Sequence, residues 1–406
     1  MKKIAVIGGG ASGLIAAHFA ASAGSRVTLF ERQKAIGRKL LVTGNGRCNI
    51  SNTGIDESRY HGRNPRFTRA VFSRFGLDET REFFASIGIP FVEEELGRLF
   101  PASLQASTVT RVFEHELAAL GVDVRLHRKI DRIVPQGDML RVVTAGREED
   151  RFDAVILAAG SCAYPQVGGS RSGYELAASL GHRVHEPFPA IVPLTIPLKA
   201  LHRLEGIKRD CALELQSGRK VLARAEGELL FTRYGLSGPA ALDLSRAVNE
   251  RAVSGSRAQI VIDLFPHYSA ADLSALLDSL FAKGDRELSF CLSGILHHRI
   301  PEVLLGIAGI DPRAKAGRLN AAVRKKISSV LKSLRLDFGP PRSFSEAVVA
   351  AGGVDVDELS QSSCESKIVR NLYMTGELLD IDGDSGGFNL QFAWSTGALA
   401  GMAASG

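Results

Sequence analysis

The sequence contains few cysteines and none in a paired motif: there are five in 406 residues, and no Cys-x-x-Cys occurs. An odd number without paired spacing argues against a disulfide framework and a dithiol redox site, and favours a reducing cytosol. No cysteine–histidine cluster has the spacing of a zinc site. No apolar run is long enough to cross a bilayer. We therefore expect a cytoplasmic protein that binds neither a metal nor a membrane.

The apolar stretch near the N-terminus is also short. Lys2 and Lys3 precede it, as in a signal peptide, but Gly8, Gly9 and Gly10 interrupt it. We therefore interpret the stretch as a strand followed by a loop, and not as a cleaved leader.

A large excess of charge of one sign is absent. The formal net charge is +6 and the pI is about 9.1, which fits an anionic small molecule and permits nucleic acid without arguing for it. Five arginines between residues 59 and 74 could face RNA, but a solvated, partly helical face is the interpretation we favour. They are Arg59, Arg63, Arg66, Arg69 and Arg74. We expect a small-molecule substrate and no nucleic-acid partner.

The composition is otherwise that of a globular protein. Hydrophobic residues make up 45% and charged residues 23% of the chain, which argues against disordered and fibrous classes. A chain of 406 residues is long for one core and predicts two or three domains. Many of the 42 glycines occur in clusters, which indicates loops that approach a ligand closely.

The first residues have the pattern of a nucleotide-binding unit. The apolar run 4–7 predicts a buried parallel strand, and Gly8, Gly10 and Gly13 complete a G-x-G-x-x-G motif directly after it. In this motif the first glycine permits a tight turn and the second lets the backbone approach a pyrophosphate. The third lets the following helix pack closely on the strand.

A helix and a second strand follow the motif. The helix covers about 12–23, so that the N–H groups of its first turn face a phosphate. The second strand begins at Arg26 and ends at Glu31, 23 residues after Gly8. A carboxylate at this distance can accept hydrogen bonds from a ribose diol, which favours FAD or NAD over NADP.

Two later parts of the chain favour FAD over NAD. An apolar strand at 155–160 ends in small residues, as a strand does when it returns to the sheet beside the cofactor. A strand at 371–375 leads into a glycine–acid turn, where the carboxylate of Glu377 could hold a ribityl chain. A helix then opens at Gly386 and runs to about Met402, and its N-terminus could point at the flavin pyrimidine. A simple NAD dehydrogenase does not need a C-terminal segment that comes back to the cofactor domain.

Three stretches resemble the HI0933-like (YhiN/BaiN-type) family of two-dinucleotide-binding-domain flavoproteins. They are 37–49, 227–239 and 365–401, and together they extend over nearly the whole chain. The resemblance implies non-covalent FAD, with NAD(P)H as a transient electron donor. Members include NAD(P)/FAD-dependent oxidoreductases, aminoacetone oxidase-like proteins and reductases of conjugated steroid enones. Arg171 and Ser172 replace a glycine and an aspartate that the family often has, so the role of that loop is left open.

The predicted FAD site gathers residues from several parts of the chain. The segment 37–52 would wrap around the phosphates and the flavin edge, with a solvated surface loop as the alternative. Within it, Cys48 is interpreted as a buried, inert thiol because no thiolate-activating partner is visible. By resemblance, the backbone of Ile130 would face adenine. The predicted cofactor-binding residues are Gly8, Gly10, Ala11, Ser12, Gly13, Glu31, Arg32, Arg38, Lys39, Leu40, Gly44, Asn45, Gly46, Arg47, Cys48, Asn49, Ile130, Ala158, Ala159, Gly160, Gly376, Glu377, Asp380, Gly386, Gly387, Phe388, Asn389, Leu390 and Gln391.

Candidates for catalysis are few. Arg233 or Tyr234 could anchor a substrate over the flavin or donate a proton, and Arg47 is a further candidate. An equally good interpretation of this segment is structural, with Ser237 capping a helix and Pro239 in its first turn. The histidines show no ligand spacing, so we expect no metal.

The predicted fold is α/β: a Rossmann-like FAD-binding domain, with a parallel sheet and helices, interrupted by an insertion. We expect the FAD-binding domain at 1–190 and 345–406 and a substrate domain at 191–344. Short alternating runs predict an antiparallel, β-barrel-like domain in 191–268. Helical patterns predict a small helical domain in 269–344.

The predicted function is hydride transfer from NAD(P)H through FAD to a small organic acceptor such as a conjugated enone. No second G-x-G-x-x-G follows a strand in the insertion, so we expect no separate NADPH domain. The first alternative is an FAD-dependent, aminoacetone-like amine oxidase that uses oxygen. An NAD dehydrogenase, an RNA-acting flavoprotein and a non-catalytic flavin-binding protein also stay open.

Overall fold

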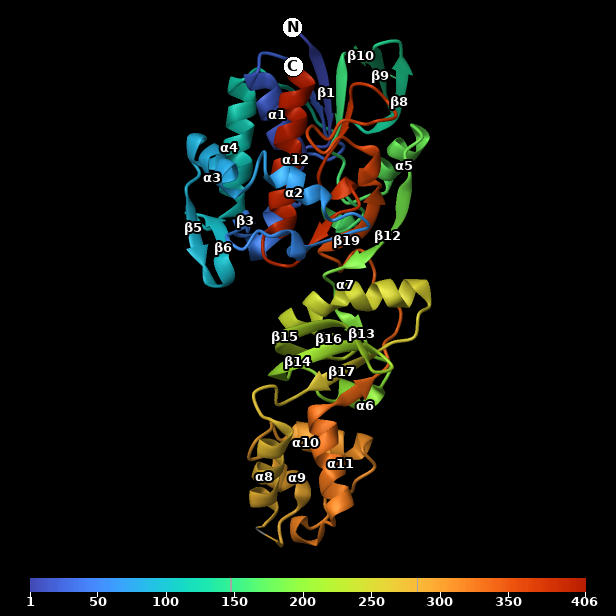
Figure 1. Cartoon of the computed structure of the whole chain (residues 1–406). Coiled ribbons are helices and arrows are strands. Elements are labelled where there is room, and N and C mark those ends of the chain that lie inside the picture. Colours follow the sequence, from blue (N-terminus) through green and yellow to red (C-terminus); the bar gives the residue numbers. More distant parts are fainter. Residues whose placement is uncertain (147, 283) are drawn as a thin grey trace. The chain divides into compact units, whose positions relative to one another are not determined.

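The computed structural model describes residues 1–146, 148–282 and 284–406. Its contacts divide the chain into two units, Met1–Pro187 with Val348–Gly406, and Phe188–Ala347. The second unit is inserted into the first along the sequence, as the colours of Figure 1 show. We call them the discontinuous unit and the inserted unit.

A five-stranded parallel sheet forms the centre of the discontinuous unit, in the order β20-β11-β1-β2-β7. Ile4, Ala5 and Val6 of the central strand are fully buried, as in a parallel strand covered on both faces. The predicted parallel sheet is therefore confirmed. Its strands are β1 (Lys3–Ile7), β2 (Arg26–Phe30), β7 (Asp123–Arg125), β11 (Ala154–Leu157) and β20 (Leu372–Met374).

The first and last helices of the chain, α1 (Ala11–Ser22) and α12 (Phe388–Ser405), lie side by side (Figure 1). Their backbones approach closely because small residues face each other. A Cβ atom added at Gly397 would lie 2.2 Å from the carbonyl oxygen of Ser12. A Cβ atom at Gly401 would lie 2.5 Å from that of Ala16. This contact fixes the N-terminus of α1 against the body of α12.

Smaller elements complete the discontinuous unit. A three-stranded antiparallel sheet has the order β10-β9-β8, and another has the order β3-β6-β5. The helices are α2 (Phe67–Phe72), α3 (Leu77–Ser86), α4 (Ala106–Ala119) and α5 (Ser172–Ser179). The strands are β3 (Ser51–Asn52), β4 (Tyr60–His61), β5 (Phe91–Glu94), β6 (Arg98–Pro101), β8 (Ile130–Gln136), β9 (Met139–Thr144), β10 (Glu149–Phe152), β12 (Val184–Ala190), β19 (Val349–Val354) and β21 (Asp382–Gly383).

The inserted unit begins with a six-stranded antiparallel sheet, in the order β13-β16-β15-β14-β17-β18. Directly after β18, the N–H of Gly339 donates to the carbonyl of Thr195 in β13, at 2.8 Å. This bond links the two ends of the strand order, so the sheet curls as expected of a barrel-like domain. The strands are β13 (Leu194–Thr195), β14 (Lys208–Ser217), β15 (Lys220–Thr232), β16 (Gly235–Ser237), β17 (Gln259–Asp263) and β18 (Leu334–Leu336).

Helices cover this sheet and form a second part of the inserted unit (Figure 1). The helix α7 begins at Pro239 with Gly238 as its N-cap, so the expected cap by Ser237 is wrong. The cap position has a φ of +86°, which suits glycine and not serine. The helices are α6 (Lys199–His202), α7 (Pro239–Ser254), α8 (Ala270–Phe281), α9 (Leu288–Leu292), α10 (Arg299–Ile307) and α11 (Ala321–Lys332).

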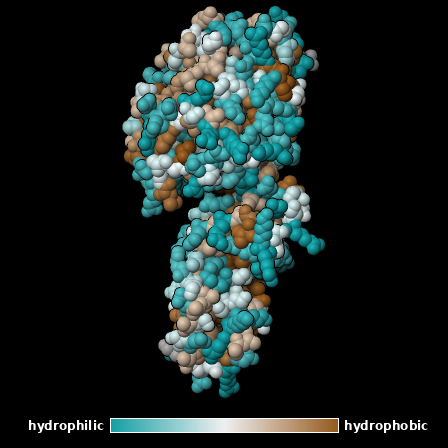
Figure 2. Space-filling model, in the orientation of Figure 1, coloured by the Kyte–Doolittle hydropathy of each residue, from teal (hydrophilic) through white to brown (hydrophobic). Residues whose placement is uncertain are grey.

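The surface carries no continuous apolar band on the face drawn in Figure 2. Hydrophilic residues predominate there, and hydrophobic residues form small separate groups. Among the helices of the described residues, none combines the length and the apolar character needed to span a membrane.

Candidate functional site

The glycine motif forms the turn between β1 and α1. Gly8 has a φ of +110°, and a Cβ atom there would lie 2.3 Å from the carbonyl oxygen of Ala158. A Cβ atom at Gly13 would lie 1.9 Å from the carbonyl oxygen of Gly8. Gly10 differs, since a Cβ atom there would meet no atom within 4 Å. The first and third glycines therefore serve packing, and the second faces open space at the start of α1, where a phosphate could lie.

The carboxylate of Glu31 lies beside this turn, at the end of β2. It accepts hydrogen bonds from the N–H of Gly9 at 2.8 Å and from the N–H of Gln33 at 2.7 Å. The next residue, Arg32, donates to the carbonyl of Gly168 at 2.6 Å. These bonds fix the acid at the edge of the turn, with lone pairs left over for a ribose diol.

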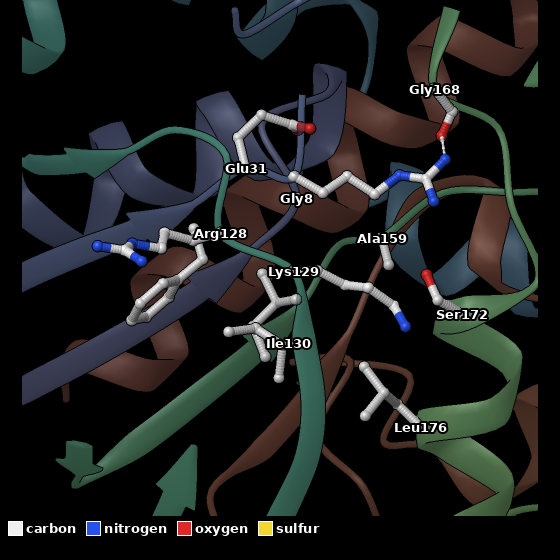
Figure 3. A pocket seen from close by; sticks show the side chains of 12 residues that line it. Gly8, Glu31, Arg128, Lys129, Ile130, Ala159, Gly168, Ser172 and Leu176 are labelled. Atoms are coloured by element: carbon white, nitrogen blue, oxygen red, sulfur yellow. Dashed lines mark hydrogen bonds between the residues drawn. The ribbon is translucent and has the colours of Figure 1, made fainter. Parts of the chain in front are cut away.

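An open pocket adjoins Glu31 (Figure 3). It brings together five of the predicted residues, from segments that are far apart in the sequence. They are Gly8, Glu31, Arg32, Ile130 and Ala159. Sequence reasoning missed its other lining residues, which are Ile7, Phe30, Arg128, Lys129, Gly168, Ser172 and Leu176.

The missed lining residues include two cations beside Ile130. In Figure 3 the side chain of Lys129 extends toward Ser172. Lys129 also forms an ion pair with Asp131, with an N–O distance of 3.0 Å. Arg128 and Lys129 could have been suspected from their position next to Ile130, which the resemblance had placed at the adenine. Ser172, in the loop that departs from the family pattern, lines the pocket as well.

A second polar cluster lies around Glu377. Its Oε2 atom is 2.6 Å from Nζ of Lys39 and accepts a hydrogen bond from the hydroxyl of Ser161 at 3.1 Å. Gly376 is held against α1, because a Cβ atom there would lie 2.6 Å from Oγ of Ser12. The structure thus joins the predicted residues Lys39, Gly376 and Glu377 to the start of α1.

The segment 37–49 contains the 3-10 helix η1 (Leu40–Gly46) and adopts a strained backbone. Asn45 and Cys48 have φ values of 55° and 62°, which non-glycine residues rarely adopt. Such strain often marks ligand sites. The N–H of Gly37 donates to the carbonyl of Gly9 at 2.7 Å, which ties the segment to the glycine motif.

Asn49 ends this segment with a buried oxygen atom. Its Oδ1 has no hydrogen-bond partner in the described part of the chain. A Cβ atom at Gly387, the N-cap of α12, would lie 2.9 Å from it. A buried acceptor without a donor is costly, so a ligand N–H at this point would offset the cost.

The cations of the segment contact other protein groups. Arg47 forms an ion pair with Glu94 at 2.7 Å, and its guanidinium lies 4.4 Å from the centre of the Phe100 ring. Arg38 donates to the side chain of Gln33 at 2.5 Å. Leu40 is buried. Arg38 and Arg47 are therefore held in position by the protein itself, which favours binding over proton transfer.

The residues at the start of α12 divide into two groups. Gly386 and Gly387 have φ values of +125° and +106° and form the turn before the helix. The side chain of Asn389 closes this turn, donating to the carbonyl of Gly383 at 2.7 Å. Gln391 is fully buried, and its amide donates to Thr80 at 2.7 Å. The side chains of Asn389 and Gln391 thus serve packing, and contact with a cofactor through Phe388, Leu390 or the backbone stays a prediction.

Asp380 belongs to a buried acidic group behind the glycine–acid turn. It is 4% exposed, and burial raises its pKa to about 6. The N–H of Arg63 donates to its Oδ2 at 3.2 Å, and Nε2 of His185 lies 4.0 Å from the same atom. Its role as a direct cofactor ligand stays a prediction.

The cysteines near the site are not suited to act as nucleophiles. Burial raises the pKa of Cys48 to about 12 and that of Cys162 to about 11, so both stay thiols at neutral pH. Within the described residues, no group of three or more His, Cys, Asp or Glu side chains could hold a metal ion.

The two catalytic candidates of the insertion belong to the other unit. Arg233 is exposed. The guanidinium of Arg342 covers the ring of Tyr234 at 3.8 Å from its centre, and Glu346 accepts two hydrogen bonds from Arg342. Tyr234 is thus held by a cation within its own unit, and a role of either residue at the cofactor stays a prediction.

The chain is similar to several known proteins. A family model described as the HI0933-like protein Rossmann domain matches residues 2–403. A 3-dehydro-bile acid delta(4,6)-reductase of Clostridium scindens is 36% identical over 413 residues, covering all of this chain and 99% of that protein. A ribosomal RNA dihydrouridine synthase of Escherichia coli is 30% identical over 399 residues, covering 96% of this chain and 95% of that protein. A solved flavocytochrome c3 fumarate reductase is 13% identical, with a TM-score of 0.48, and the match covers 100% of this chain and 78% of that one.

Proposed function

This chain belongs to the HI0933-like Rossmann-domain family of flavin-dependent oxidoreductases, and from that premise we propose that it reduces a carbon–carbon double bond conjugated to a carbonyl group. The proposal rests on one type of reaction that the names of two relatives have in common. Reduction at delta(4,6) of a 3-oxo bile acid and formation of dihydrouridine both add two hydrogens to such a bond, and relatives named for each match nearly the whole chain.

The residues present fit FAD. The open space at Gly10 suits the pyrophosphate, the carboxylate of Glu31 suits a ribose diol, and Glu377 suits the ribityl hydroxyls. The unpartnered Oδ1 of Asn49, beside the N-cap Gly387 of α12, suits an N–H on the flavin pyrimidine. When bound, FAD supplies reversible acceptance and delivery of a hydride. The protein supplies position, charge and exclusion of water.

The proposed reaction balances with NAD(P)H as the electron donor. The carbon β to the carbonyl gains a hydride, the α carbon gains a proton, and NAD(P)H becomes NAD(P)⁺. Hydride addition places negative charge on the carbonyl oxygen, so a cation and a proton donor are needed at the substrate. We assign these tasks to Arg233 and Tyr234, which are adjacent in the sequence, and the guanidinium of Arg342 covers the ring of Tyr234.

The competing function is an amine oxidase, which needs no pyridine nucleotide. The visible spectrum of the purified protein under anaerobic conditions separates the two. We expect a flavin spectrum that NADH or NADPH bleaches and that a 4-en-3-oxosteroid or a uridine-containing RNA restores. A spectrum bleached only by aminoacetone would contradict the proposal, and a protein that stays colourless after incubation with FAD would exclude both functions.

The proposed location is the cytoplasm. All five cysteines are free and buried, which suits a reducing compartment. Cell fractionation with immunodetection of the protein checks this, and recovery of the protein outside the cytoplasmic fraction would contradict the proposed location.

A further inference from the structure

The positive charge of the chain is concentrated in the inserted unit. Phe188–Ala347 contains 23 Lys and Arg against 16 Asp and Glu, a net charge of +7. The rest of the chain contains 27 against 28, a net charge of −1. The modest total of +6 therefore conceals a basic unit joined to a nearly neutral one, and it says little about binding to nucleic acid.

One segment of the inserted unit has cations without any acid. Between residues 318 and 335, around α11, there are six Lys or Arg and no Asp or Glu. Two of these cations have partners, because Arg324 pairs with Asp278 at 2.7 Å and Lys332 pairs with Asp263 at 2.6 Å. The remaining cations have no acid within this segment to balance their charge, which favours binding of an anion.

These remaining cations define what we call the α11 surface. They are Arg318, Lys325, Lys326 and Arg335. All four are exposed, and none of them has an ion-pair partner within the part of the chain that the structure describes. A solvated helix face is the ordinary state of such cations, but most solvated faces interleave both signs of charge. In the segment 318–335 no acid is interleaved with the cations, and the acids that pair with cations of this segment belong to neighbouring elements, such as Asp278 in α8.

An exposed aromatic ring belongs to the same helical part of the unit. Phe290 in α9 is 63% exposed, and the guanidinium of Arg286 lies 5.7 Å from its ring centre. Unpaired RNA bases stack on aromatic rings and on arginine planes. An acidic peptide has no need of such a ring. The combination of an unopposed basic surface with an exposed ring therefore favours RNA over an acidic protein.

We propose that the α11 surface is a docking site for the phosphate backbone of an RNA and that Phe290 stacks on an unpaired base of it. This inference rests on the proposed function and deepens it, because uracil has a C5=C6 bond conjugated to its C4 carbonyl. A uracil carried by RNA is then a substrate of the proposed class. The Escherichia coli relative, which is named for ribosomal RNA, supports this choice.

The test is fluorescence anisotropy with a labelled RNA hairpin whose loop contains unpaired uridines, using the full chain with FAD and no electron donor. The triple variant Arg318→Gln, Lys325→Gln, Lys326→Gln is compared with the unsubstituted protein at about 50 and 200 mM salt. We expect roughly tenfold weaker binding or more at the lower salt, and a slope of log K against log salt that falls in magnitude by about 2 to 3. Phe290→Ala should weaken binding about five- to hundredfold and leave the slope unchanged.

A matched control removes the same charge from the other unit. Arg66, Arg69 and Arg74 are also exposed and have no ion-pair partner within the described residues. Their triple substitution by Gln should leave RNA affinity and salt slope as they are. An equal loss in this control, absence of RNA binding at the lower salt, or equally strong binding of poly-glutamate would each overturn the proposal.

Flavin measurements on the same samples separate this inference from the proposed function. Reduction of a 4-en-3-oxosteroid without any RNA binding would overturn the docking site and leave the reductase function standing. Conversely, the protein could bind RNA, with weaker binding by the triple variant, and yet reduce no conjugated double bond. This result would overturn the reductase function and leave the docking site standing. Intact flavin spectra in all variants establish that they fold.

Discussion

The ammonium group of Lys39 lies 2.6 Å from the carboxylate of Glu377, although 338 positions separate the two residues in the sequence. Their side chains are only 24% and 20% exposed, so water screens the pair incompletely. The pair joins the segment 37–49 to the turn after β20. The two ends of the discontinuous unit are thus connected at the proposed cofactor site.

Removal of one partner of this pair should cost stability. We expect Glu377→Gln and Lys39→Met each to lower the free energy of unfolding by about 1–3 kcal/mol, because a partly buried charge is left alone. The double variant should lose less than the two single losses together, since it leaves no unpaired charge. Urea unfolding of the four proteins without FAD measures this. Strictly additive losses would show that the pair does not couple.

Substitution of alanine for Gly10, the second glycine of the motif, should weaken FAD binding without affecting folding. Gly10 has a φ of −86° and free space at its Cβ position, so Gly10→Ala should change the free energy of unfolding by less than about 1 kcal/mol. It should weaken FAD binding roughly tenfold or more, because the methyl group occupies the phosphate position.

The control is alanine at Gly13, where a Cβ atom would lie 1.9 Å from a backbone oxygen. Gly13→Ala should destabilise the protein by roughly 2–4 kcal/mol even without FAD. Thermal unfolding and FAD titration of both variants test the pair. Equal destabilisation by the two substitutions would contradict the division of roles between these glycines.

Because of Asp380, we expect the free energy of unfolding to decrease as pH rises. Its pKa is raised to about 6 in the folded protein from an ordinary value of 3.8. The folded state therefore binds the proton more tightly than the unfolded state. The resulting stabilisation is complete below about pH 4 and is lost as pH rises to about 6, with a total of roughly 3 kcal/mol.

Asp380→Asn removes this titration. We expect its free energy of unfolding, relative to that of the unsubstituted protein, to rise between pH 4 and pH 7. Chemical denaturation at several pH values measures the difference. A difference that is constant with pH would show that Asp380 does not titrate in this range.

Tyr234→Phe should slow the oxidative half-reaction, in which the conjugated acceptor is reduced. Loss of a proton donor should slow reduction of the conjugated acceptor by roughly 10²–10⁴-fold and leave flavin reduction by NAD(P)H unchanged. Tyr268→Phe, at an exposed tyrosine of the same unit, is the matched control. Stopped-flow measurement of each half-reaction distinguishes the two. Equal slowing of both half-reactions would point to a structural role for Tyr234.

The sequence was informative where a local pattern defines the contact. The G-x-G-x-x-G motif, the acid at the end of β2 and the glycines before α12 are spaced by single elements, so their positions could be predicted. Gln391 could not be assigned in this way, because the groups that bind its amide, such as Thr80, come from distant helices. His185 was missed for the same reason, since its position beside Asp380 depends on how separate strands pack.

The contact of α1 with α12 determines the order in which the chain can fold during synthesis. The strand β20 and the helix α12 are made after the whole inserted unit, yet they complete the sheet and cover α1. Until then, the face of α1 that packs against α12 has no cover and β11 lacks its partner β20, while the inserted unit already has a core of its own. We expect the inserted unit to fold first on the ribosome, and the discontinuous unit to need protection from chaperones until its last helix emerges.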